Sequence, residues 1–126
     1  TEVKEEEFVC EMPGKKVKVA VISADVMGNG DDELGKVLIK GFLYALSQME
    51  THVDTILFYN GGAKLTTEGS DSIEDLKKME AEGTEILTCG TCLKHYGLME
   101  KLLVGKVTDM YTITERMMGA DKIIRP

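Results

Sequence analysis

Two closely spaced cysteines are the part of this sequence best suited to chemistry. Cys89 and Cys92 enclose Gly90 and Thr91 in a CxxC motif. The motif directly follows residues 84–88, a short run that is typical of a buried strand. In an open α/β sheet, ligands and reacting groups collect just past the carboxyl ends of the strands. We therefore predict sulfur chemistry at such an edge.

The start of a helix is the expected source of thiol reactivity. A thiol needs a lowered pKa to act as a nucleophile at neutral pH, and the free N–H groups and dipole of a helix N-terminus provide this. If a helix begins near Thr91 or Cys92, Cys89 lies at its cap and Cys92 in its first turn. We then expect both thiols to be stabilised as thiolates. The alternative is that both are small buried hydrophobic residues, since free cysteine is commonly buried.

Three functions are compatible with such a motif. A thioredoxin-like disulfide exchanger usually has a cis-proline facing the pair, but the two prolines are Pro13 and Pro126, near the ends of the chain. A structural zinc site needs four ligands, usually in two close pairs, and Cys10, His52 and His95 are scattered, so we expect no metal. The third function is a persulfide carrier, in which one cysteine accepts a sulfane sulfur and the other resolves or protects it.

Alternating strand and helix patterns surround the motif. Apolar runs predict strands over residues 17–23, 55–59, 84–88, 104–107 and 122–124. Helical spacing predicts helices over residues 34–49, 73–79, part of 93–103, and 110–117. Strands joined by helices favour right-handed crossovers and a parallel sheet covered on both faces. We predict a three-layer α/β/α domain with a mostly parallel sheet, of the flavodoxin-like or Rossmann-like kind.

Local signals indicate where several helices begin and end. Ser72, with a carboxylate three residues on, predicts a variant of the capping box. Thr108 or Asp109 is expected to cap the last helix, and Gly97 to interrupt the helix after the CxxC motif.

Two glycine-containing loops follow predicted strand ends. The first contains Gly28 and Gly30 and is followed by three acidic residues, which would repel a phosphate, so we expect turns that bring this loop near the thiols rather than a nucleotide site. The second loop consists of Asn60, Gly61 and Gly62. It either holds an anionic substrate or a persulfide through its backbone N–H groups, or is a plain tight turn. Lys64 is its nearest expected cation. The predicted substrate-binding residues are Gly28, Gly30, Asn60, Gly61, Gly62, Gly90 and Thr91.

Length and charge narrow the class of protein. The 126 residues fit one domain, and the net charge is −7. Residues 1–12 contain five glutamates and one lysine, so we expect residues 1–15 to form an acidic linker or tail and residues 16–126 to form the domain. Clustered Lys and Arg for nucleic acid are missing, as is an apolar run of the ~18 residues that span a bilayer. The odd cysteine count does not suit a disulfide framework, and the acidic residues 1–12 do not resemble a signal peptide, so we expect a reducing, cytoplasmic setting.

Several ordered motifs resemble the DsrE/DsrF-like family of small sulfur-relay proteins. Cys89 and Gly97 keep that family's spacing between a cysteine after the third strand and a glycine eight residues later. The sequence is still more similar to the carboxy-terminal domain of YedF-type proteins, which are linked to selenium metabolism. This resemblance covers about residues 17–125 and is carried by residues 28–36, 58–62, 68–70, 89–93 and 104–111.

The resemblance implies a DsrE-like three-layer domain and homo-oligomers, often trimers or hexamers. Cys89 matches the sulfur-carrying cysteine, and Cys92 the second cysteine of the YedF-type motif. Many relay members have arginine just before the glycine, where this chain has His95 and Tyr96. YedF-type proteins usually have an amino-terminal TusA-like domain. The expected partners are therefore sulfur-donor and sulfur-acceptor proteins, among them a TusA-like domain, and no cofactor is expected.

We therefore expect a sulfurtransferase-like carrier of sulfur or selenium. The Cys89 thiolate attacks a donor persulfide, stores the sulfur and passes it to an acceptor thiol, and Cys92 resolves it by forming a disulfide. The alternative is a non-catalytic oligomeric binding or assembly module with a redox-sensitive CxxC motif. Thiol reactivity separates the two, because a relay cysteine is exposed and a structural cysteine is buried.

Overall fold

The computed structural model describes residues 16–126, so the predicted acidic tail and Cys10 lie outside the described residues. Strands and helices alternate along this part of the chain, as the sequence predicts. The elements are β1 (Lys18–Ile22), α1 (Asp32–Ser47), β2 (Thr55–Phe58), the 3₁₀ helix η1 (Asn60–Thr66), α2 (Ile73–Ala81), β3 (Glu85–Cys89), α3 (Gly90–His95), the 3₁₀ helix η2 (Met99–Lys101), β4 (Lys106–Thr108), α4 (Met110–Met118) and β5 (Lys122–Ile124).

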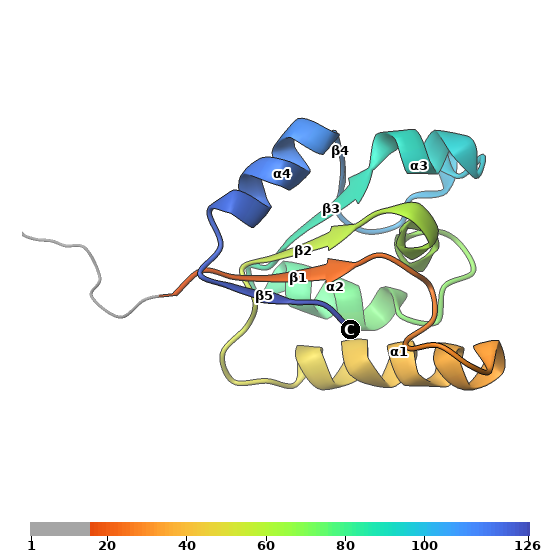
Figure 1. Ribbon diagram of the computed structural model, residues 1–126, viewed down its shortest axis with the longest axis horizontal. Coiled ribbons are helices and arrows are strands. Elements are labelled where there is room, and N and C mark those ends of the chain that lie inside the picture. Colours follow the sequence, from red (N-terminus) through yellow and green to blue (C-terminus); the bar gives the residue numbers. More distant parts are fainter. Residues whose placement is uncertain (1–15) are drawn as a thin grey trace, which may run out of the picture.

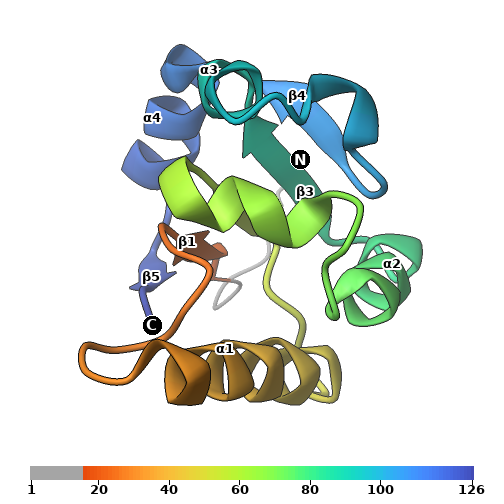
Figure 2. The ribbon, with the colours of Figure 1, turned by 90° about the vertical axis from the view of Figure 1, so that its right-hand side faces the viewer.

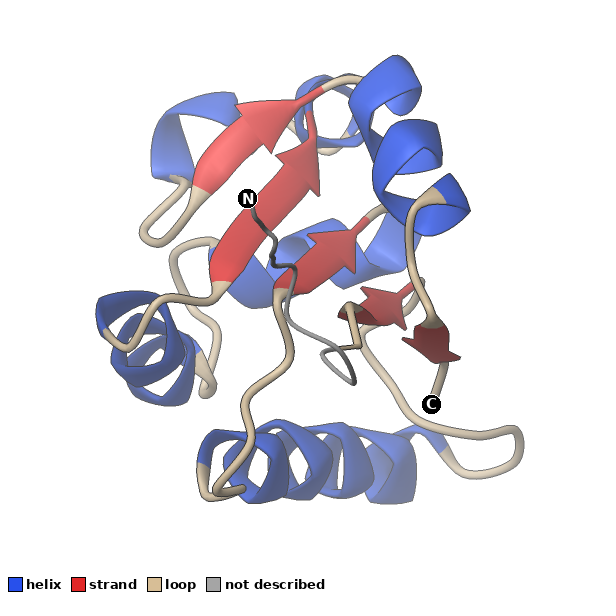
Figure 3. Cartoon of the chain, turned by 90° about the vertical axis from the view of Figure 1, so that its left-hand side faces the viewer, coloured by secondary structure: helices blue, strands red, loops and turns tan. Residues whose placement is uncertain are grey.

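The strands form one parallel sheet in the order β4-β3-β2-β1-β5 (Figure 3). Ile22, Phe58 and Thr88 lie in register across β1, β2 and β3. The carboxyl ends of these three strands therefore meet at one edge of the sheet, where the CxxC motif begins. The predicted parallel sheet is confirmed.

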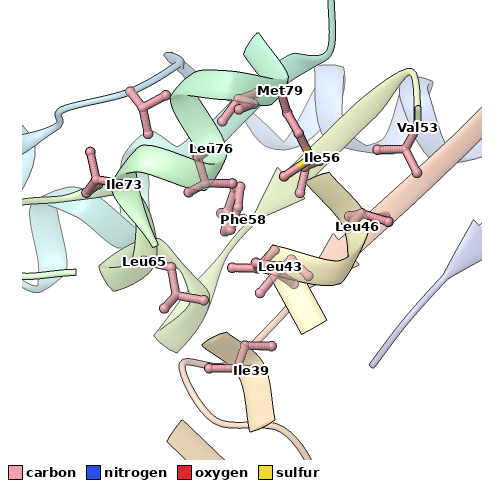
Figure 4. Packing of buried hydrophobic residues seen from close by; sticks show 14 residues of the cluster. Ile39, Leu43, Leu46, Val53, Ile56, Phe58, Leu65, Ile73, Leu76 and Met79 are labelled. Carbon is pink, nitrogen blue, oxygen red and sulfur yellow. The ribbon is translucent and has the colours of Figure 1, made fainter. Parts of the chain in front are cut away.

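Helices cover both faces of the sheet, which confirms the three-layer architecture (Figure 1). On one face, side chains of α1 and α2 pack against Ile56 and Phe58 of β2 (Figure 4). The α1 residues Ile39, Leu43 and Leu46 recur at helical spacing, and burying each side chain stabilises the fold by roughly 1.5–3 kcal/mol. The second face carries a smaller cluster beneath α4. Its buried members are Val19, Val21, Leu57, Leu87, Cys89 and Ile113.

The predicted helix ends are partly confirmed. The side chain of Asp109 caps α4 by accepting a 2.9 Å hydrogen bond from the Thr112 N–H. Ser72 is the N-cap residue of α2, as predicted, but its side chain accepts no capping hydrogen bond. Its backbone torsions, φ −104° and ψ 5°, differ from the extended geometry of a side-chain cap. Gly97 does follow the end of α3, at a φ of 68° that favours glycine.

Two helices leave apolar side chains exposed. On α1, Leu34, Val37 and Tyr44 are more than half exposed, while the opposite side of the helix is buried. On α4, Met110, Tyr111 and Met118 are similarly exposed. Within residues 16–126, no helix is both long and apolar enough to cross a bilayer.

Candidate functional site: a cysteine pair beside an asparagine N–H

Cys89 is the last residue of β3 and the N-cap residue of α3. Its side chain is 3% exposed and makes no capping hydrogen bond. Alternation along β3 turns Leu87 and Cys89 toward the face beneath α4, where Ile113 covers them. The sequence places Cys89 correctly at the helix start, but the exposure expected of a relay cysteine is absent.

Cys92 is the more accessible member of the pair. It lies in the first turn of α3 and is half-buried, and both thiols are free. The backbone N–H of Asn60 donates a 3.0 Å hydrogen bond to its Sγ atom. Burial raises the pKa of the Cys92 thiol, the neighbouring Cys89 side chain raises it further, and the Asn60 N–H opposes both. The expectation of a lowered pKa is therefore wrong for Cys92, because burial and the Cys89 side chain outweigh the Asn60 N–H.

Asn60 is held in place from two sides. It has a φ of 51°, a left-handed conformation that asparagine adopts more readily than most residues. Its side-chain Oδ1 accepts a 2.8 Å hydrogen bond from the Tyr96 hydroxyl. Lys64 lies over the Tyr96 ring, 4.7 Å from its centroid, and His95 packs edge-on against the same ring. Tyr96 therefore stands between the cysteine site and Lys64, the expected nearest cation.

The segment after β2 is the start of η1 rather than a plain tight turn. A Cβ atom on Gly62 would overlap the carbonyl of Ile22, so only glycine fits there. A Cβ atom on Gly61 would lie 3.6 Å from Oδ1 of Asp25, which places this segment against the loop after β1. The Gly62 N–H is bonded to the Tyr59 carbonyl at 3.0 Å. The Asn60 N–H is directed at the Cys92 sulfur rather than at an empty anion site.

The remaining predicted binding residues lie in two places, the loop after β1 and the CxxC motif itself. Gly28 and Gly30 adopt positive φ angles of 83° and 137°, in a loop that packs beside the start of α1 through Met27. Figure 2 shows η1 between this part of the molecule and α3. Gly90 packs against β4, since an added Cβ atom would lie 2.9 Å from Val107 Cγ1, and Thr91 is exposed.

No group of three or more His, Cys, Asp or Glu side chains in residues 16–126 is arranged to hold a metal ion.

The sequence analysis missed the contribution of Tyr96 and the direction of the Asn60 N–H. An asparagine directly after a strand and before two glycines was the available signal for a left-handed residue. The partnership with Cys92 and Tyr96 had no local signal, because these residues are 32 and 36 positions further along the chain.

Fold and site together define a parallel α/β domain with a cysteine pair at the carboxyl end of its third strand. The model of the DsrE/DsrF-like family matches residues 26–126, and the chain belongs to this family. No curated protein matches it significantly in sequence.

Solved structures share the fold. A protein of unknown function, MTH1491 from Methanobacterium thermoautotrophicum, is 20% identical with a TM-score of 0.65, covering 89% of this chain and 100% of that one. The ychN protein from E. coli is 16% identical with a TM-score of 0.66 and the same coverage. The conserved protein of unknown function BT1422 from Bacteroides thetaiotaomicron is 13% identical with a TM-score of 0.55, covering 86% and 94%.

Proposed function

We propose that this chain is a sulfurtransferase-like sulfur carrier, in which the CxxC pair holds a sulfane sulfur as a persulfide and passes it to an acceptor thiol. Membership of the DsrE/DsrF-like family is consistent with a role in sulfur relay. The observation that carries the proposal is the 3.0 Å hydrogen bond from the Asn60 N–H to Cys92 Sγ. An N–H donor at this distance stabilises negative charge on the sulfur, as both a thiolate and a persulfide require.

The two cysteines have different tasks in this proposal. The sequence favours Cys89 as the carrier, but its burial makes Cys92 the better placed to meet a donor. The Cys92 thiolate attacks the outer sulfur of a donor persulfide, R–S–SH, forming a new S–S bond while R–S⁻ leaves. The carried sulfur then passes to an acceptor thiolate. Alternatively, the Cys89 thiolate attacks Cys92 Sγ, which forms the Cys89–Cys92 disulfide and releases HS⁻.

The proposed carrier is similar to YedF-type proteins and takes selenium as an analogue of sulfur. It exchanges sulfur with donor and acceptor proteins that include a TusA-like domain, forms homo-oligomers and acts in a reducing cytoplasmic compartment. Each of these features is supported by the resemblance or by composition.

The test is the intact mass of the protein after incubation with inorganic polysulfide, with and without reductant. The wild type should gain one sulfur that reductant removes. Cys92→Ser should lose this gain, and Cys89→Ser should keep it. No gain in both the wild type and Cys89→Ser, which cannot form the disulfide, contradicts the carrier function, and a gain that survives in Cys92→Ser but not in Cys89→Ser reverses the two roles.

A non-catalytic assembly module is the second candidate. The exposed apolar side chains of α1, among them Leu34 and Val37 at 55% and 67%, favour it. Under this alternative, the protein takes up no sulfur, and polar substitutions of these two residues change the mass measured by sedimentation. Sulfur uptake by a variant with an unchanged sedimentation mass favours the carrier.

A further inference from the structure

A cleft of about 590 Å³ lies next to the cysteine site, on the far side of Tyr96. It is formed between the first turns of α1, the end of η1, and the loop that follows η1. Its volume is in the range typical of sites for small molecules, roughly 300–1,000 Å³. None of the functions argued so far uses it.

The charges around the cleft indicate what it binds. Lys40 and Glu68 line it, but they are paired with Asp75 at 2.7 Å and with Lys101 at 3.4 Å. Lys36, Asp25 and Asp71 also line it, and each lacks an ion pair among residues 16–126. Lys64 likewise has no carboxylate partner among residues 16–126, and its ammonium group lies over the Tyr96 ring. Two lysines and two carboxylates are thus available to a ligand.

The uncharged lining combines the hydroxyl side chains of Thr67, Ser70 and Ser72 with an apolar part. Ile39 and Leu65 are 2% and 8% exposed, and Leu98 is half-buried. Unpaired charges of both signs next to an apolar surface complement a molecule that carries both an ammonium group and a carboxylate. A nucleotide is a poorer match, because its phosphates would meet Asp25 and Asp71 as well as the lysines.

Two residues that line this cleft also contact η1, the element whose first residue, Asn60, donates a hydrogen bond to Cys92. Tyr96 lines the cleft and donates its hydroxyl to Asn60, whose N–H donates to Cys92 Sγ. Asp25 lines the cleft and lies against Gly61. Cys92 itself is not among the lining residues. A ligand bound here therefore reaches the thiol only if its own sulfur is on a flexible arm.

We propose that this cleft binds a short zwitterionic peptide thiol, and that the persulfide of that thiol is the sulfur donor to Cys92. This inference rests on the proposed carrier function. The lysines hold the carboxylate of the ligand, the aspartates hold its ammonium group, and the peptide is long enough for its sulfur to pass Tyr96. In the transfer, R–S–SH and the Cys92 thiolate give R–S⁻ and the Cys92 persulfide, with no oxidant or reductant consumed.

The test compares two sulfur donors on the same variants of the full chain. Glutathione persulfide carries the zwitterionic peptide, whereas inorganic polysulfide has nothing to anchor. The test variant is Lys36→Gln with Asp71→Asn, which keeps the net charge and leaves the Cys92 network intact. The matched control is Lys77→Gln with Glu80→Gln, an exposed pair on α2 away from the cleft.

Sulfur uptake is followed by intact mass over time. The test variant should take sulfur from glutathione persulfide at least about tenfold more slowly than the wild type, because it weakens two charged contacts and the loss of one charge-assisted hydrogen bond already costs about that much. Its uptake from polysulfide should be unchanged, and the control should match the wild type with both donors. Equal uptake from glutathione persulfide by the test variant and the wild type overturns the proposal and leaves the carrier function standing.

A second measurement separates the cleft from the carrier function. S-methylglutathione, which cannot donate sulfur, is titrated into each protein and followed by calorimetry. Saturable binding that the test variant loses supports the binding site even if the wild type takes sulfur from neither donor. Absence of binding to the wild type overturns the site.

Discussion

The backbone N–H of Asn60 lies 3.0 Å from the Sγ atom of Cys92 and donates a hydrogen bond to it. Asn60 begins η1 directly after β2, and Cys92 lies in the helix that follows β3. Because Phe58 and Thr88 are in register on these neighbouring strands, the pairing of β2 with β3 sets the distance between donor and sulfur. The pairing of these two strands therefore places a hydrogen-bond donor beside the thiol.

The reactivity of Cys92 should depend on pH in a defined direction. Burial and the Cys89 side chain raise the pKa of Cys92, so its thiolate fraction at pH 7 is small and grows as pH rises. We expect its rate of alkylation by iodoacetamide, measured by peptide mass spectrometry, to reach half its maximum above about pH 8.5, the ordinary pKa of a free thiol. In Cys89→Ala the midpoint should move to lower pH. A wild-type midpoint below pH 8 contradicts the assignment.

Tyr96→Phe tests the support of Asn60. The variant removes the hydroxyl that donates to Asn60 Oδ1 and keeps the ring that contacts Lys64 and His95. Loss of the hydrogen bond that positions Asn60 should raise the barrier to sulfur uptake from polysulfide by about 1 kcal/mol, which slows uptake by about fivefold. The control is Tyr111→Phe, at a residue that is 77% exposed on α4. Uptake by Tyr96→Phe at the wild-type rate would show that Asn60 needs no such support.

Gly62→Ala and Gly41→Ala should have opposite effects on stability. At Gly62 the added methyl group overlaps the carbonyl of Ile22, a buried residue of β1, so we expect a loss of roughly 3 kcal/mol or more. At Gly41, within α1, the methyl group meets nothing within 4 Å, and alanine should stabilise the helix by about 0.5–1 kcal/mol. Urea unfolding of both variants decides, and similar midpoints would contradict the close approach at Gly62.

Glu85→Gln tests an ion pair between β3 and α4. Arg116 donates to both carboxylate oxygens of Glu85, at 2.8 and 2.9 Å, and holds the pKa of Glu85 below its usual value of 4.5. The pair therefore stabilises the fold above about pH 4.5, and this contribution is lost as pH falls through the lowered pKa. Both side chains are more than one-third exposed, so we expect a loss of about 1 kcal/mol at pH 7.

The pH dependence provides the check for that pair. The difference in unfolding free energy between the wild type and Glu85→Gln should shrink as pH falls through the lowered pKa of Glu85, because the wild-type carboxyl then becomes protonated. Glu115→Gln removes only a 3.3 Å contact of the same arginine and should change stability less. A difference for Glu85→Gln that is constant from pH 3 to pH 7 would exclude a charge-dependent role.

Most of the fold follows from sequence periodicity. The buried strand β1 and the amphipathic α1 can be predicted because their apolar residues recur at the periods of a covered strand and of a helix. The helical form of η1 could not be predicted in this way. Gly62 is forced into place by the Ile22 carbonyl, a contact between segments 40 residues apart that no local pattern encodes.

The features of the cysteine site likewise fall into those that follow from local sequence and those that depend on tertiary packing. The position of Cys89 at the start of a helix follows from a CxxC motif after a strand, a purely local pattern. The accessibility of the two thiols does not, because the helix that covers Cys89 is α4, which comes later in the chain. The raised pKa of Cys92 likewise depends on tertiary packing.

The order of the strands determines when each side of β1 can be paired as the chain is synthesised. β1 pairs with β5, which ends 106 positions after β1 begins, and the Val17 N–H is bonded to Asp121 at a separation of 104 residues. Asn60, Cys92 and Tyr96 lie within the earlier stretch that contains β2, β3 and α3. The thiol and its N–H donor are therefore synthesised before the strand that closes the open side of β1. A chain emerging from the ribosome therefore displays a bare β1 edge until β5 has been synthesised, and an unpaired edge of this kind is a template for pairing with other chains.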